Sequence, residues 1–222
     1  YLGLPRVLAN TAAFGLSDAY DVFCVASPGY REVFERKGVR PDKLIVTGIP
    51  TFDQVVALRH NDFPHRDYVL ICTSNARETF KPDDRLGFLR RARELAAGRP
   101  VIVKLHPAER HDRATAEVRR ILPEALVLVD GNTEHMVANA AMVLTQYSTV
   151  ALTAAALGTS VYSYLDPEMV RRVLPANPDG QSARRIAAVC RALLTGAPLR
   201  SAVGSQAPVE ARDFGHVRLM PR

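Results

Sequence analysis

The chain has 222 residues, 47% of them hydrophobic and 23% charged, a composition typical of a soluble globular protein that excludes disorder over most of its length. Its net charge of +6 is modest, and the basic residues are spread along amphipathic segments, as on solvated helix faces. Its apolar stretches are shorter than the roughly 20 residues of a membrane helix, and the start lacks the features of a signal peptide, so we expect a cytoplasmic protein.

Short apolar runs alternate with helical patterns along most of the chain. The runs are continuous and rich in Val, Ile and Leu, as expected of strands in a parallel sheet that is covered on both faces. Strands are predicted at residues 21–26, 43–47, 68–73, 100–105, 125–130, 142–145 and 160–164. Helices are predicted at residues 28–37, 82–97, 110–122, 134–140, 148–157 and 181–194. This β-α-β-α order predicts an α/β protein with a doubly wound parallel sheet.

Two sequence features divide the chain. Residues 47–50 lie between a predicted strand and a new helix, which indicates a boundary between a small N-terminal piece, 1–48, and a main domain, 49–195. After residue 195 the helical periodicity fades into a segment that contains Ser, Gly and Pro, so residues 196–222 are predicted to form an extended C-terminal arm. Because the chain begins at Tyr1 rather than Met, we expect a fragment or a processed protein.

The three cysteines, Cys24, Cys72 and Cys190, are an odd number and lack the spacing of metal ligands. Cys24 and Cys72 lie within predicted strands. We therefore predict buried free thiols rather than a disulfide, and we propose no metal site.

In an open parallel sheet, ligands bind beyond the carboxyl ends of the strands, so the residues that directly follow each predicted strand are the candidates for a binding site. Four polar loops meet this condition. The candidates are Ser74, Asn75 and Arg77 in the first loop, Lys104 and His106 in the second, Asp130, Asn132 and Thr133 in the third, and Tyr147, Ser148 and Thr149 in the fourth.

Ser148 and Thr149 form the most specific of these patterns. They stand where a strand ends and a helix of small residues begins, so backbone N–H groups, the positive end of the helix dipole and two hydroxyls converge there. Such a site holds a phosphate or pyrophosphate; the alternative is that Ser148 only caps the helix. The glycine patterns of P-loop and dinucleotide-binding proteins are absent, which disfavours a P-loop nucleotidase and an NAD-dependent dehydrogenase.

The second loop carries a histidine and a lysine. Pro107 biases His106 toward an extended conformation, which presents the imidazole to a phosphate or as a general acid or base; alternatively, the pair only ends the strand. Lys104 lies within an apolar strand, where an ammonium group needs an anion or a carboxylate nearby; alternatively, its side chain snorkels at the strand end. In the first loop, Arg77 either reaches a ligand phosphate as a bidentate donor or forms an ion pair with Glu78.

In their order, these loops resemble those in the C-terminal half of GT-B glycosyltransferase-fold proteins, in the group that joins the UDP-N-acetylglucosamine 2-epimerases to the CDP-glycerol glycerophosphotransferases and capsule-type glycosyltransferases. The resemblance covers residues 21–165. Residues 104–107 are similar to the Lys-Leu-His-Pro segment of these proteins, and residues 144–149 with the following helix resemble their phosphate-holding loop. Residues 21–53 resemble the end of their first domain and the crossing into the second.

Differences from the family motifs affect the choice within this group. Arg77 and Glu78 match the Thr-Ala-His-Arg-Arg-Glu-Asn segment of the 2-epimerases, but Asn75 stands in place of its His. The segment 147–149, Tyr-Ser-Thr, is nearer to the Asp-Tyr-Ser-Ser loop of the glycerophosphotransferases and capsule-type transferases, with Gln146 in place of the Asp.

The resemblance implies a fold and a set of functions. The fold is a Rossmann-like, doubly wound parallel sheet that is the C-terminal half of a GT-B architecture, with 1–48 as the end of an N-terminal Rossmann-like domain and 49–195 as the nucleotide-donor-binding domain. The leading function is a transferase that moves a sugar or glycerophosphate from a nucleotide donor during the synthesis of surface polysaccharides or glycoconjugates. The alternatives are a UDP-N-acetylglucosamine 2-epimerase-like enzyme and a non-catalytic nucleotide-binding α/β module.

For the site, the resemblance implies that a UDP- or CDP-linked donor lies across the carboxyl ends of the strands, with no cofactor or metal required. His106 would be the catalytic residue, and donor groups of the protein would stabilise the charge of the leaving group. The diphosphate would contact Ser148, Thr149, Lys104 and His106, and the base or ribose would lie near Asp130, Asn132 and Thr133.

The expected partners are the nucleotide donor and an acceptor that the sequence does not identify. A general base for the acceptor would come from the first domain, which this chain is expected largely to lack. Trp is absent and the aromatic residues lie mostly in apolar runs, so no nucleic-acid partner is expected. The absence of a membrane segment leaves peripheral attachment to a membrane with a lipid-linked acceptor open.

Overall fold

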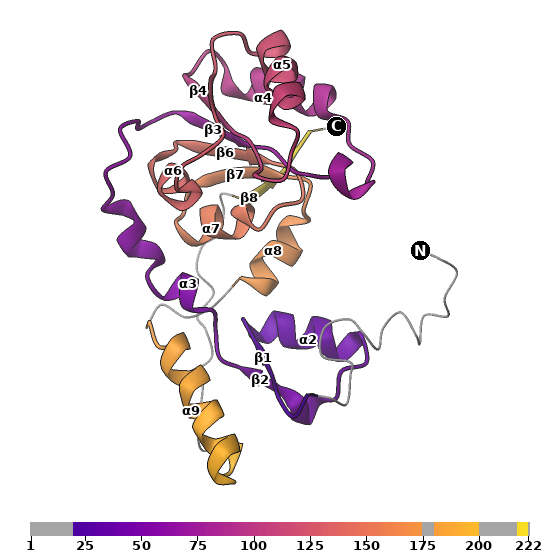
Figure 1. Cartoon of the computed structure of the whole chain (residues 1–222), viewed down its shortest axis with the longest axis vertical. Helices are drawn as coiled ribbons and strands as arrows, with labels where there is room; N and C mark the ends of the chain where they lie inside the picture. The colour runs from indigo at the N-terminus through magenta and orange to yellow at the C-terminus, as the bar shows by residue number, and fades with distance from the viewer. Residues whose placement is uncertain (1–19, 175–179, 200–216, 222) are drawn as a thin grey trace. The chain divides into compact units, whose positions relative to one another are not determined.

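The computed structural model describes residues 20–174, 180–199 and 217–221 (Figure 1). The chain divides into two compact units, one formed by Tyr1–Gln54 with Arg172–Ala211 and the other by Val55–Arg171 with Arg212–Arg222. This division differs from the boundaries drawn from the sequence. Helix α9 (Ser182–Thr195), which those boundaries assign to the main domain, is part of the first unit.

The first unit contains a pair of parallel strands, β1 (Phe23–Val25) and β2 (Leu44–Val46). Helix α2 (Pro28–Arg36) follows β1, and the hydroxyl of Ser27 accepts the backbone N–H of Tyr30 at 3.1 Å, which caps the first turn of the helix. The remaining elements are η1 (Pro41–Lys43), α3 (Pro50–Asp53) and α9.

The second unit is built on a six-stranded parallel sheet in the order β5-β4-β3-β6-β7-β8. Every residue of β3 and β6 is buried, which explains why the sequences of these strands are continuously apolar rather than alternating. The strands are β3 (Val69–Cys72), β4 (Val101–Lys104), β5 (Leu126–Leu128), β6 (Met142–Thr145), β7 (Ser160–Ser163) and β8 (Val217–Leu219). The expected α/β fold with a Rossmann-like, doubly wound parallel sheet is confirmed.

Helices cover both faces of this sheet. α4 and α5 pack against each other on one face, and α6 and α7 lie together on the other (Figure 1). On the α4 side, Phe88 and Leu89 are 0% exposed and form a core with Ile71, Val103 and other strand residues. The helices are α4 (Arg85–Ala96), α5 (His111–Ile121), α6 (Thr133–Asn139), α7 (Val150–Ala156), α8 (Pro167–Val173), η2 (Val55–Arg59) and η3 (Arg77–Thr79).

All seven predicted strands and all six predicted helices are present, most of them one to four residues shorter than predicted. The prediction of an extended arm after residue 195 is wrong for Val217–Leu219, which form β8 and pair with β7 so that Val217 lies opposite Val161. Three residues are too few to show a periodic pattern, and this strand forms because β7 offers an open edge. Residues 200–216 of the predicted arm lie outside the described part of the chain.

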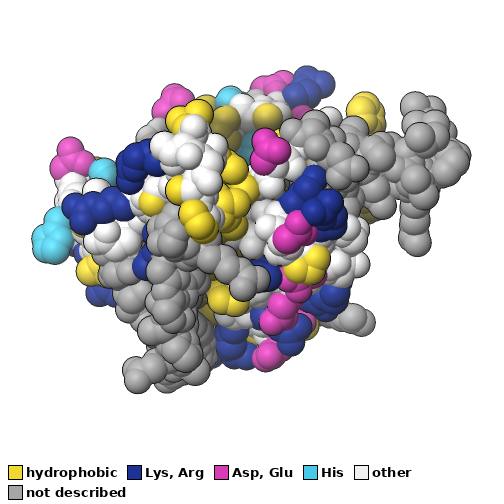
Figure 2. All heavy atoms as spheres, turned by 90° about the horizontal axis from the view of Figure 1, so that it is seen from below, with side chains coloured by type: hydrophobic (Ala, Val, Ile, Leu, Met, Phe, Trp, Pro, Cys, Tyr) yellow, Lys and Arg dark blue, Asp and Glu magenta, His cyan; other side chains and the backbone are white. Residues whose placement is uncertain are grey.

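The three cysteines are free, as predicted, although only Cys72 is fully buried; Cys24 is half-buried and Cys190 is exposed. On the face drawn in Figure 2, Lys and Arg side chains are interspersed with Asp and Glu rather than gathered in a stripe of one sign. Among the helices that the structure describes, none is both long enough and apolar enough to cross a bilayer.

Candidate functional site

The carboxyl edge of the second unit's sheet brings three of the candidate loops side by side. In the sheet register, Cys72 at the end of β3 lies opposite Lys104 of β4 on one side and Thr145 of β6 on the other. The chain runs outward from β3 through β4 to β5 and then crosses to β6 on the opposite side of β3. The strand order therefore reverses between β3 and β6, and a crevice at such a switch point is where open α/β sheets bind ligands.

The loop after β6 carries the predicted phosphate-binding hydroxyls. The Oγ of Ser148 accepts the backbone N–H of Val150, the first residue of α7, at 3.2 Å, although the N-cap position of the helix is Thr149 rather than Ser148. The hydroxyl uses an oxygen lone pair for this bond, which leaves its own proton available for an anionic acceptor. Thr149 is exposed and its side chain makes no capping bond. The bond from Val150 and phosphate binding by Ser148 are thus compatible.

Tyr147 presents an anchored aromatic ring beside this loop. Its side chain is 71% exposed, and its ring centroid lies 5.5 Å from that of Tyr164. Tyr164 in turn packs edge-on against the buried ring of Phe88 at 6.2 Å. Partial burial raises the pKa of the Tyr164 hydroxyl. The exposed ring of Tyr147 is therefore held against the core instead of moving freely at the surface.

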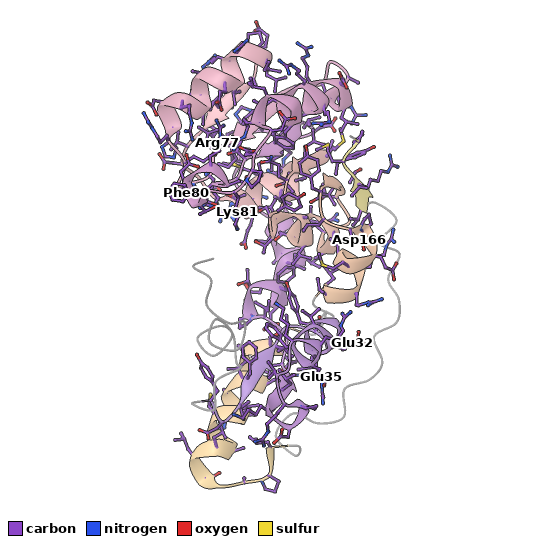
Figure 3. All side chains as sticks on the ribbon, turned by 90° about the vertical axis from the view of Figure 1, so that its right-hand side faces the viewer. Glu32, Glu35, Arg77, Phe80, Lys81 and Asp166 are labelled. Atoms are coloured by element: carbon purple, nitrogen blue, oxygen red, sulfur yellow. The ribbon has the colours of Figure 1, made fainter. Side chains whose placement is uncertain are left out.

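The loop after β3 is joined directly to the loop after β6. The Oγ of Ser74 donates a hydrogen bond to Oε1 of Gln146 at 2.8 Å. Asn75 is half-buried, and its carbonyl accepts the backbone N–H of Thr79 at 3.1 Å. The loop ends in Phe80, whose side chain is 98% exposed, and Figure 3 shows Phe80 near Arg77 at one edge of this unit.

Arg77 is occupied by carboxylates of the protein. Its two terminal nitrogens donate to the carboxylate oxygens of Glu117 at 2.8 and 2.5 Å, and its Nε lies 3.2 Å from Oδ2 of Asp83. The bond with Glu117 raises the pKa of Arg77 and lowers that of Glu117. Glu78 pairs with Arg113, so the expected Arg77–Glu78 ion pair is wrong. Contact between Arg77 and a ligand phosphate stays a prediction. It requires the guanidinium to bind Glu117 and the phosphate at once, or to break its bonds with Glu117.

Lys104 is almost fully buried at the end of β4. Its ammonium group donates to the backbone carbonyls of Leu105 at 2.9 Å and Val129 at 2.8 Å. Two carbonyl dipoles thus supply part of the partner expected for this lysine, and its contact with an anion stays a prediction. An ammonium group has three N–H donors, so one remains for a ligand.

His106 is held by its backbone and by one ring nitrogen. Its N–H lies 3.0 Å from Oγ1 of Thr73 and 3.1 Å from Oε2 of Glu109, both of which accept it. Its Nδ1 accepts the backbone N–H of Ala108 at 3.1 Å. Because Nδ1 acts as an acceptor, the neutral imidazole carries its proton on Nε2. Nε2–H is then the group that His106 can offer to a phosphate oxygen.

The loop after β5 lies farther from the switch point. Asn132 caps α6, because its Oδ1 accepts the N–H groups of Glu134 at 2.9 Å and His135 at 3.2 Å. Asp130 is exposed, and Thr133 is half-buried at the start of α6. Neighbouring strands lie about 4.8 Å apart, so β5 and β6, which are three spacings apart, are separated by about 14 Å. The predicted base or ribose contacts are thus well separated from Ser148.

Beneath the three loops lies a buried polar cluster that sequence reasoning missed. Arg85 is 2% exposed, and its NH2 donates to Oε1 of Glu109 at 2.6 Å and to the carbonyl of Ser74 at 2.8 Å. The same nitrogen lies 3.4 Å from Oδ2 of Asp83, whose Oδ1 accepts Nε2 of Gln146 at 2.6 Å. The signal available in the sequence was a Gln, where the resembling transferases have an Asp, directly after a buried strand.

The chain was compared with known proteins. No protein-family model matches it, and no curated protein matches it in sequence. Its structure is similar to that of a putative UDP-N-acetylglucosamine 2-epimerase from Listeria monocytogenes, with 16% identity and a TM-score of 0.56 over 81% of this chain and 62% of that chain. It is similar to the Methanocaldococcus jannaschii UDP-GlcNAc 2-epimerase in complex with UDP-GlcNAc and UDP, with 15% identity and a TM-score of 0.55 over 79% of this chain and 61% of that one. It is also similar to the S. aureus MnaA–UDP co-structure, with 12% identity and a TM-score of 0.57 over 82% of this chain and 62% of that one.

These similarities establish the fold. At 12–16% identity they show the fold alone: the chain has the Rossmann-like fold found in these three structures. It spans 61–62% of the length of the three chains. A shared fold at this identity supports many functions, so substrate and reaction must be argued from the site.

Proposed function

We propose that this chain binds a UDP- or CDP-linked sugar or polyol across the carboxyl edge of its second unit and forms the donor-binding part of a transferase that builds surface polysaccharide or glycoconjugate. The observation that carries the proposal is the joined switch point, where the Ser74–Gln146 hydrogen bond of 2.8 Å unites the loops after β3 and β6. A switch point of this kind is the general ligand site of open α/β sheets. Two of the structurally similar proteins were solved with UDP.

The donor set around this switch point suits a diphosphate. Ser148 offers its hydroxyl proton, Lys104 its third N–H and His106 its Nε2–H, and all three groups are neutral or cationic. Donors that are already in place stabilise the negative charge that develops on a leaving nucleotide without the cost of reorganising water. In this proposal they do the work that a divalent cation does in other transferases.

The remaining candidates extend the site along the edge. A separation of about 14 Å between β5 and β6 leaves room for a nucleoside diphosphate lying across the strands, with its base or ribose near Asp130 and Thr133. Asn132 contributes mainly by fixing the start of α6. The aromatic ring of Tyr147, beside Ser148, can pack against a ring of the donor. His106 is the proposed catalytic residue because its Nε2–H would reach the phosphate of the leaving group.

A UDP-sugar 2-epimerase is the second candidate, favoured by the three structural similarities above. The side chains of this chain argue against it: Leu152 and Thr153 stand near the positions where the resembling 2-epimerases carry paired Glu, and Leu152 is buried. A non-catalytic nucleotide-binding module is the third candidate. Incubation with UDP-N-acetylglucosamine, followed by chromatography of the released sugar, separates an epimerase from the other two.

The proposal is tested by calorimetric titration of the purified chain with UDP, CDP, CMP and GDP. We expect selective binding of one nucleotide, weakened by Ser148→Ala and by His106→Ala. Matched controls are Ser160→Ala, at the opposite end of the strands, and His65→Ala, an exposed histidine. Both should bind like the unmodified protein. Absence of binding by any of the four nucleotides to a chain shown to be folded would refute the donor site.

A further inference from the structure

The side chain of Gln146 joins two loops at the switch point by using both ends of its amide. Its Oε1 accepts the hydroxyl proton of Ser74 at 2.8 Å, and its Nε2 donates to Oδ1 of Asp83 at 2.6 Å. Gln146 itself is 4% exposed. The backbone carbonyl of Gln146 is also fixed, because it accepts the hydroxyl of Ser163 at 2.6 Å. The residue directly before Tyr147 and Ser148 is therefore held on three sides.

Only a neutral group that donates and accepts at once satisfies this position. A carboxylate in place of Gln146 would set a second negative oxygen against Asp83, and like charges in a buried site repel strongly. An apolar side chain would leave Oδ1 of Asp83 without its Gln146 donor and the hydroxyl of Ser74 without its acceptor. The charge on Asp83 thus gives a physical reason why this chain has Gln where the resembling transferases have Asp.

The contact continues from Asp83 to the backbone of His106. Asp83 and Glu109 flank the same nitrogen of Arg85, at 3.4 and 2.6 Å. The second oxygen of Glu109 accepts the N–H of His106 at 3.1 Å. A continuous series of polar contacts therefore runs from the loop after β6, past the loop after β3, to the loop after β4.

Stability alone does not account for this cluster. Nε and NH1 of Arg85 and Oδ2 of Asp83 are buried and have no hydrogen-bond partner among the described residues. Replacing a buried ion cluster by apolar side chains is often neutral or stabilising, because the charges lose their water. A cluster that is incompletely satisfied and lies under three candidate ligand loops calls for a reason other than folding energy.

We infer that Gln146 and Asp83 are positioning residues, which set Ser148 and His106 in one arrangement for an anionic ligand through Ser74, Arg85 and Glu109. The ligand part of this inference rests on the proposed nucleotide site. The arrangement of His106 is a property of the ligand-free chain and can be measured without any ligand. The two can therefore fail separately.

The test uses three variants: Gln146→Met, Gln146→Glu, and a double variant that combines Asp83→Asn with Gln146→Glu, called the exchange. The first removes both amide bonds without adding charge, the second adds a charge, and the exchange restores a carboxylate–amide pair with the original net charge. We expect the affinity for UDP or CDP to fall about tenfold in both single variants, as for the loss of one or two buried hydrogen bonds, and to return to within about threefold in the exchange.

A second readout is the long-range ¹H–¹⁵N spectrum of the imidazoles, in which His106 is assigned by comparison with His106→Gln. In the ligand-free chain, Gln146→Met should move the His106 signals, and the exchange should return them. The matched control is Asn139→Leu, which removes another buried amide, bonded to Asn61 at 2.9 and 3.0 Å at the opposite end of the strands. It should lower the melting temperature without changing affinity or the His106 signals.

Several results would overturn the inference. The first is unchanged nucleotide affinity in Gln146→Met, including the case in which only Gln146→Glu loses affinity, because that loss is an effect of charge alone. The second is a failure of the exchange to restore binding. The third is an equal loss of affinity in Asn139→Leu. If the unmodified chain binds no nucleotide, the proposed function fails, and the His106 spectra decide the inference alone. Unmoved His106 signals in Gln146→Met would then overturn it. If Gln146→Met does not fold, Gln146→Glu and the exchange supply the same comparison.

Discussion

The buried cluster around Arg85 allows the loss of stability in an Arg85 variant to be predicted. Among the described residues, Arg85→Met removes the only guanidinium within 4 Å of Glu109 and leaves Arg77 as the one guanidinium beside Asp83. The side chains of Asp83 and Glu109 are 0% and 1% exposed, so water does not replace the lost partner. Breaking a buried ion pair from one side costs about 3–5 kcal/mol. For a protein of this size that corresponds to a fall in melting temperature of roughly 6–20 °C.

The assay is equilibrium urea unfolding, supported by thermal melts of the same samples. Arg85→Met should lose about 3–5 kcal/mol, and the combination of Arg85→Met with Asp83→Asn and Glu109→Gln should recover most of that loss because no unpaired charge stays buried. Arg90→Met, on the exposed face of the same helix, is the control and should change stability by less than about 0.5 kcal/mol. A loss below about 1 kcal/mol in Arg85→Met, or no recovery in the combined variant, would refute the reasoning.

Three further predictions concern other contacts. Arg77 lowers the pKa of Glu117 below its ordinary value of 4.5, so this ion pair stabilises the fold at neutral pH. The stabilisation is lost as the pH falls from about 4.5 through the lower folded-state pKa. Glu117→Gln should therefore reduce the fall in the urea midpoint between pH 6 and pH 2. Ser27→Ala removes the cap of α2 and the bond of 2.9 Å from the Ser27 hydroxyl to the carbonyl of Val173, so it should cost about 1–3 kcal/mol in the same unfolding assay. Phe88→Ala, at a position with 0% exposure, should cost about 3–5 kcal/mol and lower nucleotide affinity in calorimetry by releasing the Tyr164–Tyr147 pair, whereas unchanged affinity would show that the rings act independently.

The local hydrophobic pattern of the sequence predicts most of the strands and helices of the fold. The strands of the sheet centre were predictable because their residues are buried on both faces and so form short apolar runs that a helix-period pattern does not produce. The helices between them showed their own periodicity and, at Gly38, Gly98 and Gly158, positive φ angles of 96°, 81° and 71°, which glycine adopts without strain. β8 was not predictable, because a three-residue strand is defined by its partner rather than by its own sequence.

The candidate site was only partly predictable. The rule that ligands bind at the carboxyl ends of strands identified the right loops, and the register of β3, β4 and β6 brings three of them together. The partners of the polar side chains were not predictable. Arg77 in η3 bonds to Glu117 of α5, 40 residues away, rather than to the adjacent Glu78, because the fold brings these two distant segments together.

The sequence by itself determined the order of strands and helices, the parallel sheet and the edge at which polar residues gather, because these depend on hydrophobic period and on residues adjacent in the chain. Only the tertiary structure decided which of the gathered groups are free to meet a ligand. Asn132, Arg77 and two of the N–H donors of Lys104 form hydrogen bonds within the protein. In the part of the chain that the structure describes, the hydroxyl proton of Ser148 and Nε2 of His106 have no such partner. The physical reason is that a hydrogen bond is decided by which donor and acceptor meet in space, and packing between distant segments sets that meeting.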